Sequence, residues 1–149
     1  MPDYDLIAIL GPTASGKTPF AATLAAELNT EIISADSRQI YRGMPVGTAA
    51  PTPSELGAAR HHFVAMLDPT DYYSAAQYEQ EALAKLQELW RVSDFAVMAG
   101  GSMMYVDAVT RGIDDLPTIS AEVRARALEI FNEEGLEGVT RRLRELDPE

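Results

Sequence analysis

The sequence of 149 residues contains no cysteine, which excludes disulfide bonds, thiol nucleophiles and thiolate metal sites. It has no apolar run near the roughly 18 residues that a membrane span requires. Its acidic first residues are unlike a signal peptide. These absences predict a cytoplasmic protein that has no membrane partner, and no pattern in the sequence predicts a protein partner.

Basic residues are also scarce. The chain has 12 lysines and arginines against 23 aspartates and glutamates, which gives a formal net charge of −11. So acidic a chain is unsuited to broad, nonspecific binding of nucleic acid, because such binding relies on cations that neutralise phosphates. Any contact with nucleic acid must therefore be local, or be made by other parts of a longer protein.

The most informative motif that is present reads GPTASGKT and occupies residues 11–18. It matches the pattern G-x-x-x-x-G-K-[ST] at every position, between an expected strand at Leu6–Leu10 and an expected helix at Lys17–Leu28. In such a loop, backbone N–H groups surround an anion, and the following helix adds its positive dipole end. Lys17 supplies a mobile cation, and the Thr18 hydroxyl suits Mg²⁺. The predicted phosphate-binding residues are Gly11, Pro12, Thr13, Ala14, Ser15, Gly16, Lys17 and Thr18.

Short apolar segments alternate with helical ones over residues 1–117, which predicts a parallel α/β sheet with flanking helices. The expected strands are Leu6–Leu10, Glu31–Ala35, Phe63–Met66 and Phe95–Ala99. Besides Lys17–Leu28, we expect three helices, which begin at Ser54, at Ser74 and at Ser102. Met98, Met103 and Met104 are expected in the core, and Trp90 is expected to be a partly buried anchor.

Residues 118–149 have a different character, because they are helical, charged and without strand patterns. Ser120 is expected to cap a helix that ends near Glu134, and Gly135 separates it from a second helix at Leu136–Leu146. This segment therefore predicts the beginning of a helical subdomain, next to a core at residues 1–117.

Asp36 directly follows the expected strand Glu31–Ala35. In open α/β sheets, ligands collect at the carboxyl ends of the strands. If this strand neighbours Leu6–Leu10, Asp36 lies close to the bound phosphate. A carboxylate there can hold Mg²⁺ indirectly, accept a proton from a nucleophile, or cap a loop, and the residues alone leave these roles open. Arg38 and Gln39 can bind phosphate or base edges, or face solvent.

Two further short patterns are ambiguous. Gly100 and Gly101 follow a strand and permit either close approach to a ligand or a tight turn into a helix, where Ser102 can act both as cap and as contact. His61 and His62 are adjacent, and neighbours on a strand point to opposite faces. That geometry disfavours chelation of one metal ion and favours a structural or surface pair.

Four stretches, taken together, resemble the tRNA dimethylallyltransferases, also called tRNA isopentenyltransferases. They read GPTASGKT, EIISADSRQIYRGMPVGTAAPT, HHFVAMLDPTDYYSAAQY and AGGSMMYVDAVTRGIDDLP, and they cover residues 7–117 almost continuously. The resemblance implies a P-loop NTPase-like, kinase-like fold. It also implies transfer of a dimethylallyl group from dimethylallyl diphosphate to the exocyclic amine of the adenine next to the anticodon of tRNA, with Mg²⁺ as cofactor.

The resemblance also implies roles for particular residues. Residues 11–18 correspond to the family's phosphate loop, with Lys17 and Thr18 stabilising the departing pyrophosphate, and Asp36 corresponds to its catalytic aspartate. The family usually has threonine where this chain has Ser102, so the hydroxyl is kept. The residues that the resemblance implies in tRNA contact are Asp36, Ser37, Arg38, Gln39, Ser102 and Arg124.

Members of this family are about twice as long, so we expect this chain to be a partial or shortened form that stops inside the helical insertion. Three functions remain open on the sequence. They are a tRNA prenyltransferase (with a variant that prenylates free adenine nucleotides), a small-molecule kinase that uses the same loop for ATP, and a noncatalytic diphosphate-binding fragment.

Overall fold

The computed structural model describes residues 4–113 and 119–148. Residues 4–113 belong to one compact unit, and residues 119–148 belong to a second. The predicted boundary after residue 117 lies outside the described residues. The elements are β1 (Asp5–Leu10), α1 (Lys17–Glu27), β2 (Ile32–Ala35), α2 (Pro53–Ala58), β3 (His61–His62), α3 (Ala75–Leu89), β4 (Phe95–Gly100), α4 (Met103–Arg111) and α5 (Ala121–Leu146).

The described strands form one parallel sheet in the order β1-β4-β2-β3. The predicted parallel α/β class is confirmed, but the assumption that the second strand neighbours the first is wrong. Strand β4 lies between β1 and β2 and pairs with both, so that Gly100 is opposite Leu10 on one side and Ala35 on the other. The carboxyl ends of these three strands therefore meet at one edge of the sheet.

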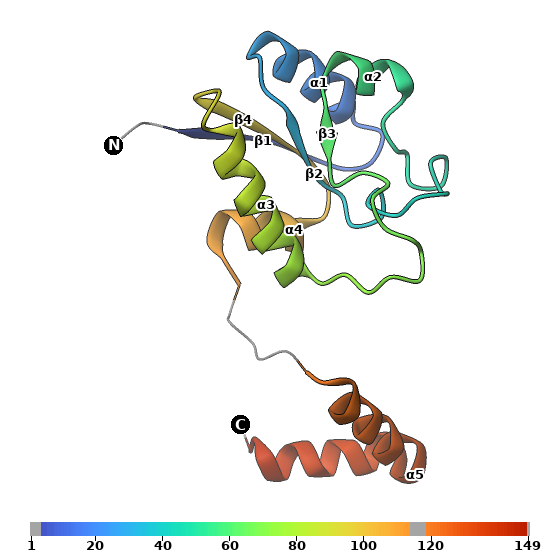
Figure 1. Ribbon diagram of the computed structural model, residues 1–149. Helices are drawn as coiled ribbons and strands as arrows, with labels where there is room; N and C mark the ends of the chain where they lie inside the picture. Colours follow the sequence, from blue (N-terminus) through green and yellow to red (C-terminus); the bar gives the residue numbers. More distant parts are fainter. Residues whose placement is uncertain (1–3, 114–118, 149) are drawn as a thin grey trace. The chain divides into compact units, whose positions relative to one another are not determined.

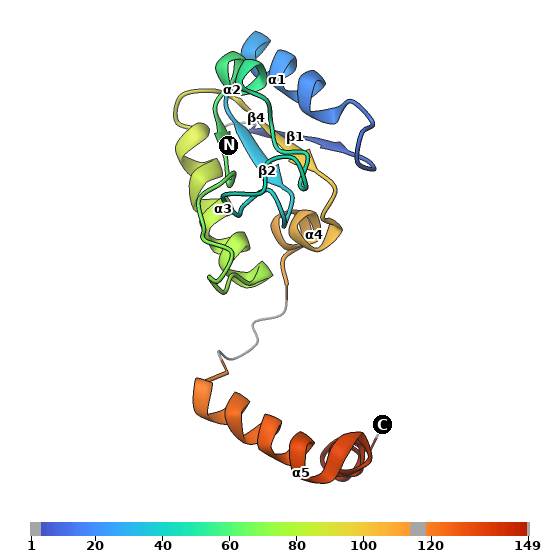
Figure 2. The same cartoon turned by 90° about the vertical axis from the view of Figure 1, so that its right-hand side faces the viewer.

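Helices cover both faces of the sheet, as Figures 1 and 2 show: α1 and α2 lie on one face, and α3 and α4 on the other. Adjacent residues of β2 serve opposite faces, because Ile32 packs in the cluster with α1 and Ile33 in the cluster with α3. Strand β4 is buried as predicted, with Val97 and Met98 fully inaccessible. This two-sided burial matches a central strand of a parallel sheet.

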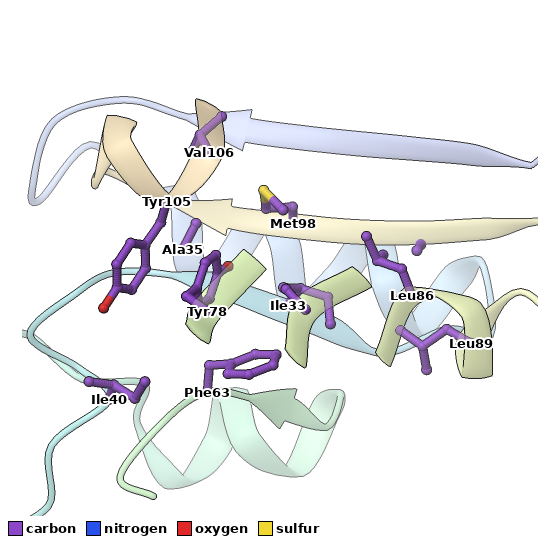
Figure 3. Close-up of a cluster of buried hydrophobic side chains, with 12 residues drawn as sticks. Ile33, Ala35, Ile40, Phe63, Tyr78, Leu86, Leu89, Met98, Tyr105 and Val106 are labelled. Carbon is purple, nitrogen blue, oxygen red and sulfur yellow. The ribbon is translucent and has the colours of Figure 1, made fainter. Parts of the chain in front are cut away.

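The larger core cluster is shown in Figure 3, where the ring of Tyr78 in α3 lies against that of Tyr105 in α4. Their centroids are 4.1 Å apart, and the rings are stacked. The Tyr78 hydroxyl donates to the backbone carbonyl of Ser34 at 3.0 Å. The core thus holds α3 against the end of β2, two residues before Asp36.

Two element predictions are wrong at their boundaries. The third strand is His61–His62 rather than Phe63–Met66, because Phe63 and Ala65 have φ values of 62° and 49°, which are incompatible with an extended strand. Helix α2 is capped by Thr52 rather than Ser54, in a capping box with Glu55. The capping box that was predicted at Ser74 and Gln77 is confirmed.

The predicted burial of the methionines is correct only in part. Met98 is inaccessible, but Met103 and Met104 are 48% and 69% exposed. They occupy the first turn of α4. Trp90 is partly buried as predicted; it stacks on Tyr4 with a centroid distance of 5.6 Å.

The second described unit is helical, as predicted. Ser120 accepts a hydrogen bond from the N–H of Val123 and begins α5. Gly135, with φ 67° and ψ −169°, interrupts the helix and divides it in two. Glu134 then binds Arg142 and Arg141, and these contacts lower the pKa of its carboxyl.

Candidate functional site

The loop that joins β1 to α1 has the backbone form that an anion-binding loop needs. Gly16 caps α1 in the left-handed region at φ 83°, and Ala14 has φ 64°. The Lys17 ammonium folds back over the loop, donating to the carbonyl of Pro12 at 2.5 Å and lying 3.5 Å from the Ser15 hydroxyl. The loop therefore folds its cation back onto its own backbone.

A cavity of about 470 Å³, called here the phosphate cavity, opens beside this loop. It is lined by the loop residues from Thr13 to Pro19, by Asp36 and Gln39 after β2, and by the loop before α2. Lys17 and Thr18 are both in its wall. The carboxyl edge of the sheet and the start of α1 thus form one concave site.

A second cavity of about 310 Å³, called here the strand-tip cavity, adjoins the first. It is lined by Gly11, Pro12, Thr13, Asp36, Ser37, Arg38, Gly101 and Ser102. Thr13 and Asp36 line both cavities. The carboxylate-bearing residue therefore stands between the phosphate loop and the residues that the resemblance assigns to tRNA.

Asp36 caps the loop that follows it. Its Oδ1 atom accepts hydrogen bonds from the backbone N–H groups of Arg38 at 2.9 Å and Gln39 at 3.2 Å. Within the described part of the chain, these are its only hydrogen bonds, and none involves Oδ2. Oδ1 thus orients the side chain by capping the loop, and this capping role is compatible with either of the other two roles that the sequence leaves open.

Ser102 ties the ends of β2 and β4 together. Its hydroxyl oxygen accepts a hydrogen bond from the Ser37 N–H at 2.8 Å and donates to the Ser37 hydroxyl at 3.0 Å, while its own N–H donates to the carbonyl of Ala35 at 3.0 Å. It precedes α4 as N-cap without a side-chain cap bond. The hydroxyl that the family resemblance emphasises therefore positions the segment that carries Asp36.

The first of the two glycines before Ser102 is needed for close packing of backbones, and the second lies at a tight contact. A Cβ on Gly100 would lie 2.1 Å from the carbonyl oxygen of Ala35, and one on Gly101 would lie 3.2 Å from the carbonyl oxygen of Gly11. Both glycines also line a cavity. Of the two readings of this pair, the structure favours the tight junction of strand ends, which in turn shapes the site.

Gln39 has a role that the sequence did not reveal. Its amide nitrogen donates to the carbonyl of Ala49 at 2.9 Å and to that of Thr48 at 3.3 Å, and its amide oxygen faces the Ser34 hydroxyl at 3.4 Å. It thereby holds the loop that forms the far wall of the phosphate cavity. Arg38, by contrast, is exposed and lines the strand-tip cavity.

The histidines lie in different environments, which agrees with the preference for a structural pair over a chelating one. His62 contacts the carboxylate of Glu31. His61 lines the phosphate cavity and places Nδ1 2.9 Å from the carbonyl of Ala59, while its buried Nε2 has no hydrogen-bond partner among the residues that the structure describes. Burial lowers the pKa of His61, partly offset by its bond to Ala59 and by Glu55.

Sequence reasoning therefore missed part of the cavity wall. Thr48, Ala49, Glu55 and His61 all line the phosphate cavity, but no local motif marks them. Arg124, the last residue of the predicted tRNA-contacting set, is an exposed residue of α5 in the second unit. In the described ranges there is no group of three or more His, Cys, Asp or Glu residues that could hold a metal ion.

A glycine-bracketed loop between a central parallel sheet and its first helix places the protein in the P-loop NTPase-like class of α/β folds. The model of the IPP transferase family matches residues 39–149, and the chain belongs to this family.

Curated relatives of similar sequence agree with this family assignment. The chain is 50% identical over 149 residues to tRNA dimethylallyltransferase 1 of Phocaeicola vulgatus, covering 100% of this chain and 49% of that protein. It is 52% identical over 144 residues to tRNA dimethylallyltransferase 1 of Bacteroides thetaiotaomicron, covering 97% of this chain and 47% of that protein. The chain thus spans about half the length of the curated relatives it matches.

Solved structures show the same fold. The crystal structure of the full-length tRNA isopentenylpyrophosphate transferase from Bacillus halodurans is similar with a TM-score of 0.72 and 34% identity, over 97% of this chain and 48% of that one. A eukaryotic dimethylallyltransferase acting on tRNA gives a TM-score of 0.79 at 23% identity, over 97% of this chain and 36% of that one.

Among the described helices, none combines the length and apolarity needed to cross a membrane.

Proposed function

We propose that this chain provides the donor-binding and acceptor-orienting parts of a prenyl transfer to tRNA. In this reaction a dimethylallyl group passes from dimethylallyl diphosphate to the exocyclic amine of the adenine next to the anticodon. One observation carries the proposal: Asp36 and Thr13 line both the phosphate cavity and the strand-tip cavity. A donor in the first and an adenine in the second would meet at a carboxylate.

The donor's diphosphate would bind at the phosphate loop. The allylic C–O bond breaks as the new C–N bond forms, so negative charge grows on the departing pyrophosphate. The loop amides and the Lys17 ammonium would stabilise this charge, because preorganised donors of this kind stabilise a transition state without reorganisation. Lys17 would exchange its contact with the Pro12 carbonyl for a phosphate oxygen.

The residues present fit a magnesium ion that is held mainly by its substrate. Thr18 lines the phosphate cavity, and its hydroxyl would hold the ion. Mg²⁺ usually binds through one or two protein ligands together with substrate phosphates and water, rather than in an all-protein cage. Bound there, the ion would neutralise charge on the leaving pyrophosphate.

The acceptor amine needs a base, because its lone pair is delocalised into the adenine ring. The Oδ2 atom of Asp36 would accept its proton, while Oδ1 keeps the side chain oriented through the N–H groups of Arg38 and Gln39. General base catalysis of this kind contributes about 10²–10⁴ in rate. The target adenine must also leave its stack in the RNA, at a cost of a few kcal/mol. This cost favours an adenine in an unpaired loop such as that of the anticodon. We therefore propose the anticodon stem-loop of tRNA as the partner of this protein, and the cytoplasm as the place where the protein acts.

One assay with Mg²⁺ and three substrate mixtures tests the proposal. The mixtures are dimethylallyl diphosphate with an anticodon stem-loop, dimethylallyl diphosphate with AMP, and ATP alone. Prenylated adenine in the stem-loop is the expected product, and prenylated AMP would instead identify a nucleotide prenyltransferase. Release of ADP without prenyl transfer would identify a kinase. Thermal stabilisation by pyrophosphate without any turnover would mean that this half binds the donor but needs further parts for catalysis.

A further inference from the structure

The loop between β2 and α2 exposes apolar side chains at a position where the core does not need them. Val46 is 95% exposed and Met44 is 42% exposed. Single apolar residues on a surface are common. These two, however, line a groove of about 500 Å³, called here the loop groove, together with Arg38, Tyr41 and Pro45.

Hydrogen bonds within the loop and from Gln39 hold the shape of the loop groove. The Thr48 hydroxyl donates to the carbonyl of Met44 at 2.9 Å, and the N–H of Ala50 donates to the carbonyl of Pro45 at 2.9 Å. The Gln39 side-chain amide also holds this loop, because it donates a hydrogen bond to the backbone carbonyl of Ala49. Exposed apolar groups in a preorganised loop lose little entropy on binding, which is the property expected of a recognition surface.

The groove is continuous with the proposed acceptor site. Arg38 lines both the loop groove and the strand-tip cavity, where Asp36 lies. Its guanidinium makes no ion pair within the described ranges, whereas that of Arg42 binds Asp68 at 3.2 Å. A cation is thus left at the junction of the two hollows, on a chain whose net charge is otherwise −11.

The chemistry of the groove suits a nucleobase. A tyrosine ring and a guanidinium plane are the surfaces on which unpaired bases stack, and single-stranded loops are recognised in this way. Tyr41 and Arg38 supply such surfaces, and Met44, Pro45 and Val46 supply an apolar border. An uncharged peptide side chain would have no use for the cation at the junction.

We propose that the loop groove holds the unpaired base next to the reactive adenine, so that one nucleotide occupies the strand-tip cavity while its neighbour is bound against Tyr41 and Val46. This inference rests on the proposed function and extends it, because it assigns the protein a second base-binding position. The neighbouring base would then fix the register of the RNA and help to keep the reactive adenine unstacked.

A double-mutant cycle tests the inference. The protein is the chain itself, as wild type and as Val46→Ser. The RNA is a fluorescein-labelled stem-loop with adenine in its loop, either intact or with the nucleotide 5′ or 3′ of the target adenine made abasic. Affinity is measured by fluorescence anisotropy. The matched control is Val92→Ser, because Val92 is 79% exposed and lies in the turn before β4, away from the carboxyl edge of the sheet.

We expect Val46→Ser to weaken binding of intact RNA about five-fold, the effect of removing one apolar contact of this size, and Val92→Ser to leave it unchanged. The loss should vanish on one of the two abasic RNAs, because the groove then has no base to hold. The salt dependence of binding should stay the same, since no phosphate contact is removed.

Equal affinities of Val46→Ser and wild type for intact RNA would overturn the inference, as would an unchanged loss on both abasic RNAs. Parallel titration with inorganic pyrophosphate separates this failure from failure of the proposed function. If the chain binds pyrophosphate and RNA and Val46→Ser has no effect, the proposed function is retained and the base-binding role of the loop groove is rejected. Binding of neither ligand contradicts both.

Discussion

Residue 100 has to be glycine because of its position against Ala35: a Cβ there would lie 2.1 Å from the Ala35 carbonyl oxygen and 2.4 Å from its carbonyl carbon. The contact is between backbones, so no side chain can move aside to relieve it. Strands β2 and β4 pair at this point, directly before Asp36 and Ser102. The geometry of the site therefore depends on a residue without chemistry of its own.

The first prediction concerns Gly100→Ala. Overpacking a tight interior position costs about 1–3 kcal/mol, and we expect a loss of at least 2 kcal/mol in the free energy of unfolding, measured by urea denaturation. The matched control is Gly57→Ala, because nothing lies within 4 Å of a Cβ at Gly57 in helix α2. Alanine is the better helix former there, so the control should be as stable as wild type or more so. Equal midpoints for the two variants would show that the strand ends are not closely packed.

The second prediction concerns the pH dependence of stability. Burial lowers the pKa of His61 below its ordinary value of 6.5, so the unfolded chain binds a proton at a pH where the folded chain does not. The free energy of unfolding should therefore fall as the pH drops below about 6.5, and it should be insensitive to this group at higher pH.

The chain has two histidines, so the contribution of His61 can be isolated. His61→Gln should make the decline between pH 6.5 and 5.5 shallower, whereas His62→Gln should retain the contribution of His61. Urea titrations at three pH values measure both slopes. A decline that is as steep in His61→Gln as in wild type would assign the acid sensitivity to other groups.

The third prediction concerns Lys17→Ala and the binding of pyrophosphate. A hydrogen bond to a charged group is worth about 1.5–3 kcal/mol, so affinity should fall by about 10- to 100-fold in isothermal titration calorimetry with Mg²⁺ present. Lys85→Ala is the control, because Lys85 is a lysine of α3 that binds Glu88 and lines neither cavity. Unchanged titration heats for Lys17→Ala would remove the loop from the donor site.

The sequence predicted the elements of the fold better than their arrangement. Apolar runs and caps such as Ser74 and Ser120 indicate helices and strands locally, but no local pattern encodes that β4 inserts between β1 and β2. The third strand was misplaced because Phe63 and Val64 look like strand residues, although Phe63 adopts a left-handed backbone.

The site was predictable only where a motif marks it. The phosphate loop and Asp36 follow strands with recognisable spacing, and the structure brings them to one pair of adjoining cavities. The part played by Gln39 in holding Thr48 and Ala49 depends on tertiary contacts. The same is true of His61, which reaches the phosphate cavity only because β3 pairs with β2.

The role of Asp36 is tested most directly by Asp36→Asn, which keeps an amide oxygen for the N–H groups of Arg38 and Gln39 but removes the base. The measurement compares pyrophosphate affinity with the rate of prenyl transfer to a stem-loop, in a form of the protein long enough to show transfer. We predict an affinity within about two-fold of wild type and a rate reduced by about 10²–10⁴. Transfer at the wild-type rate would contradict the account, because the carboxylate between the two cavities would then have no part in the chemistry.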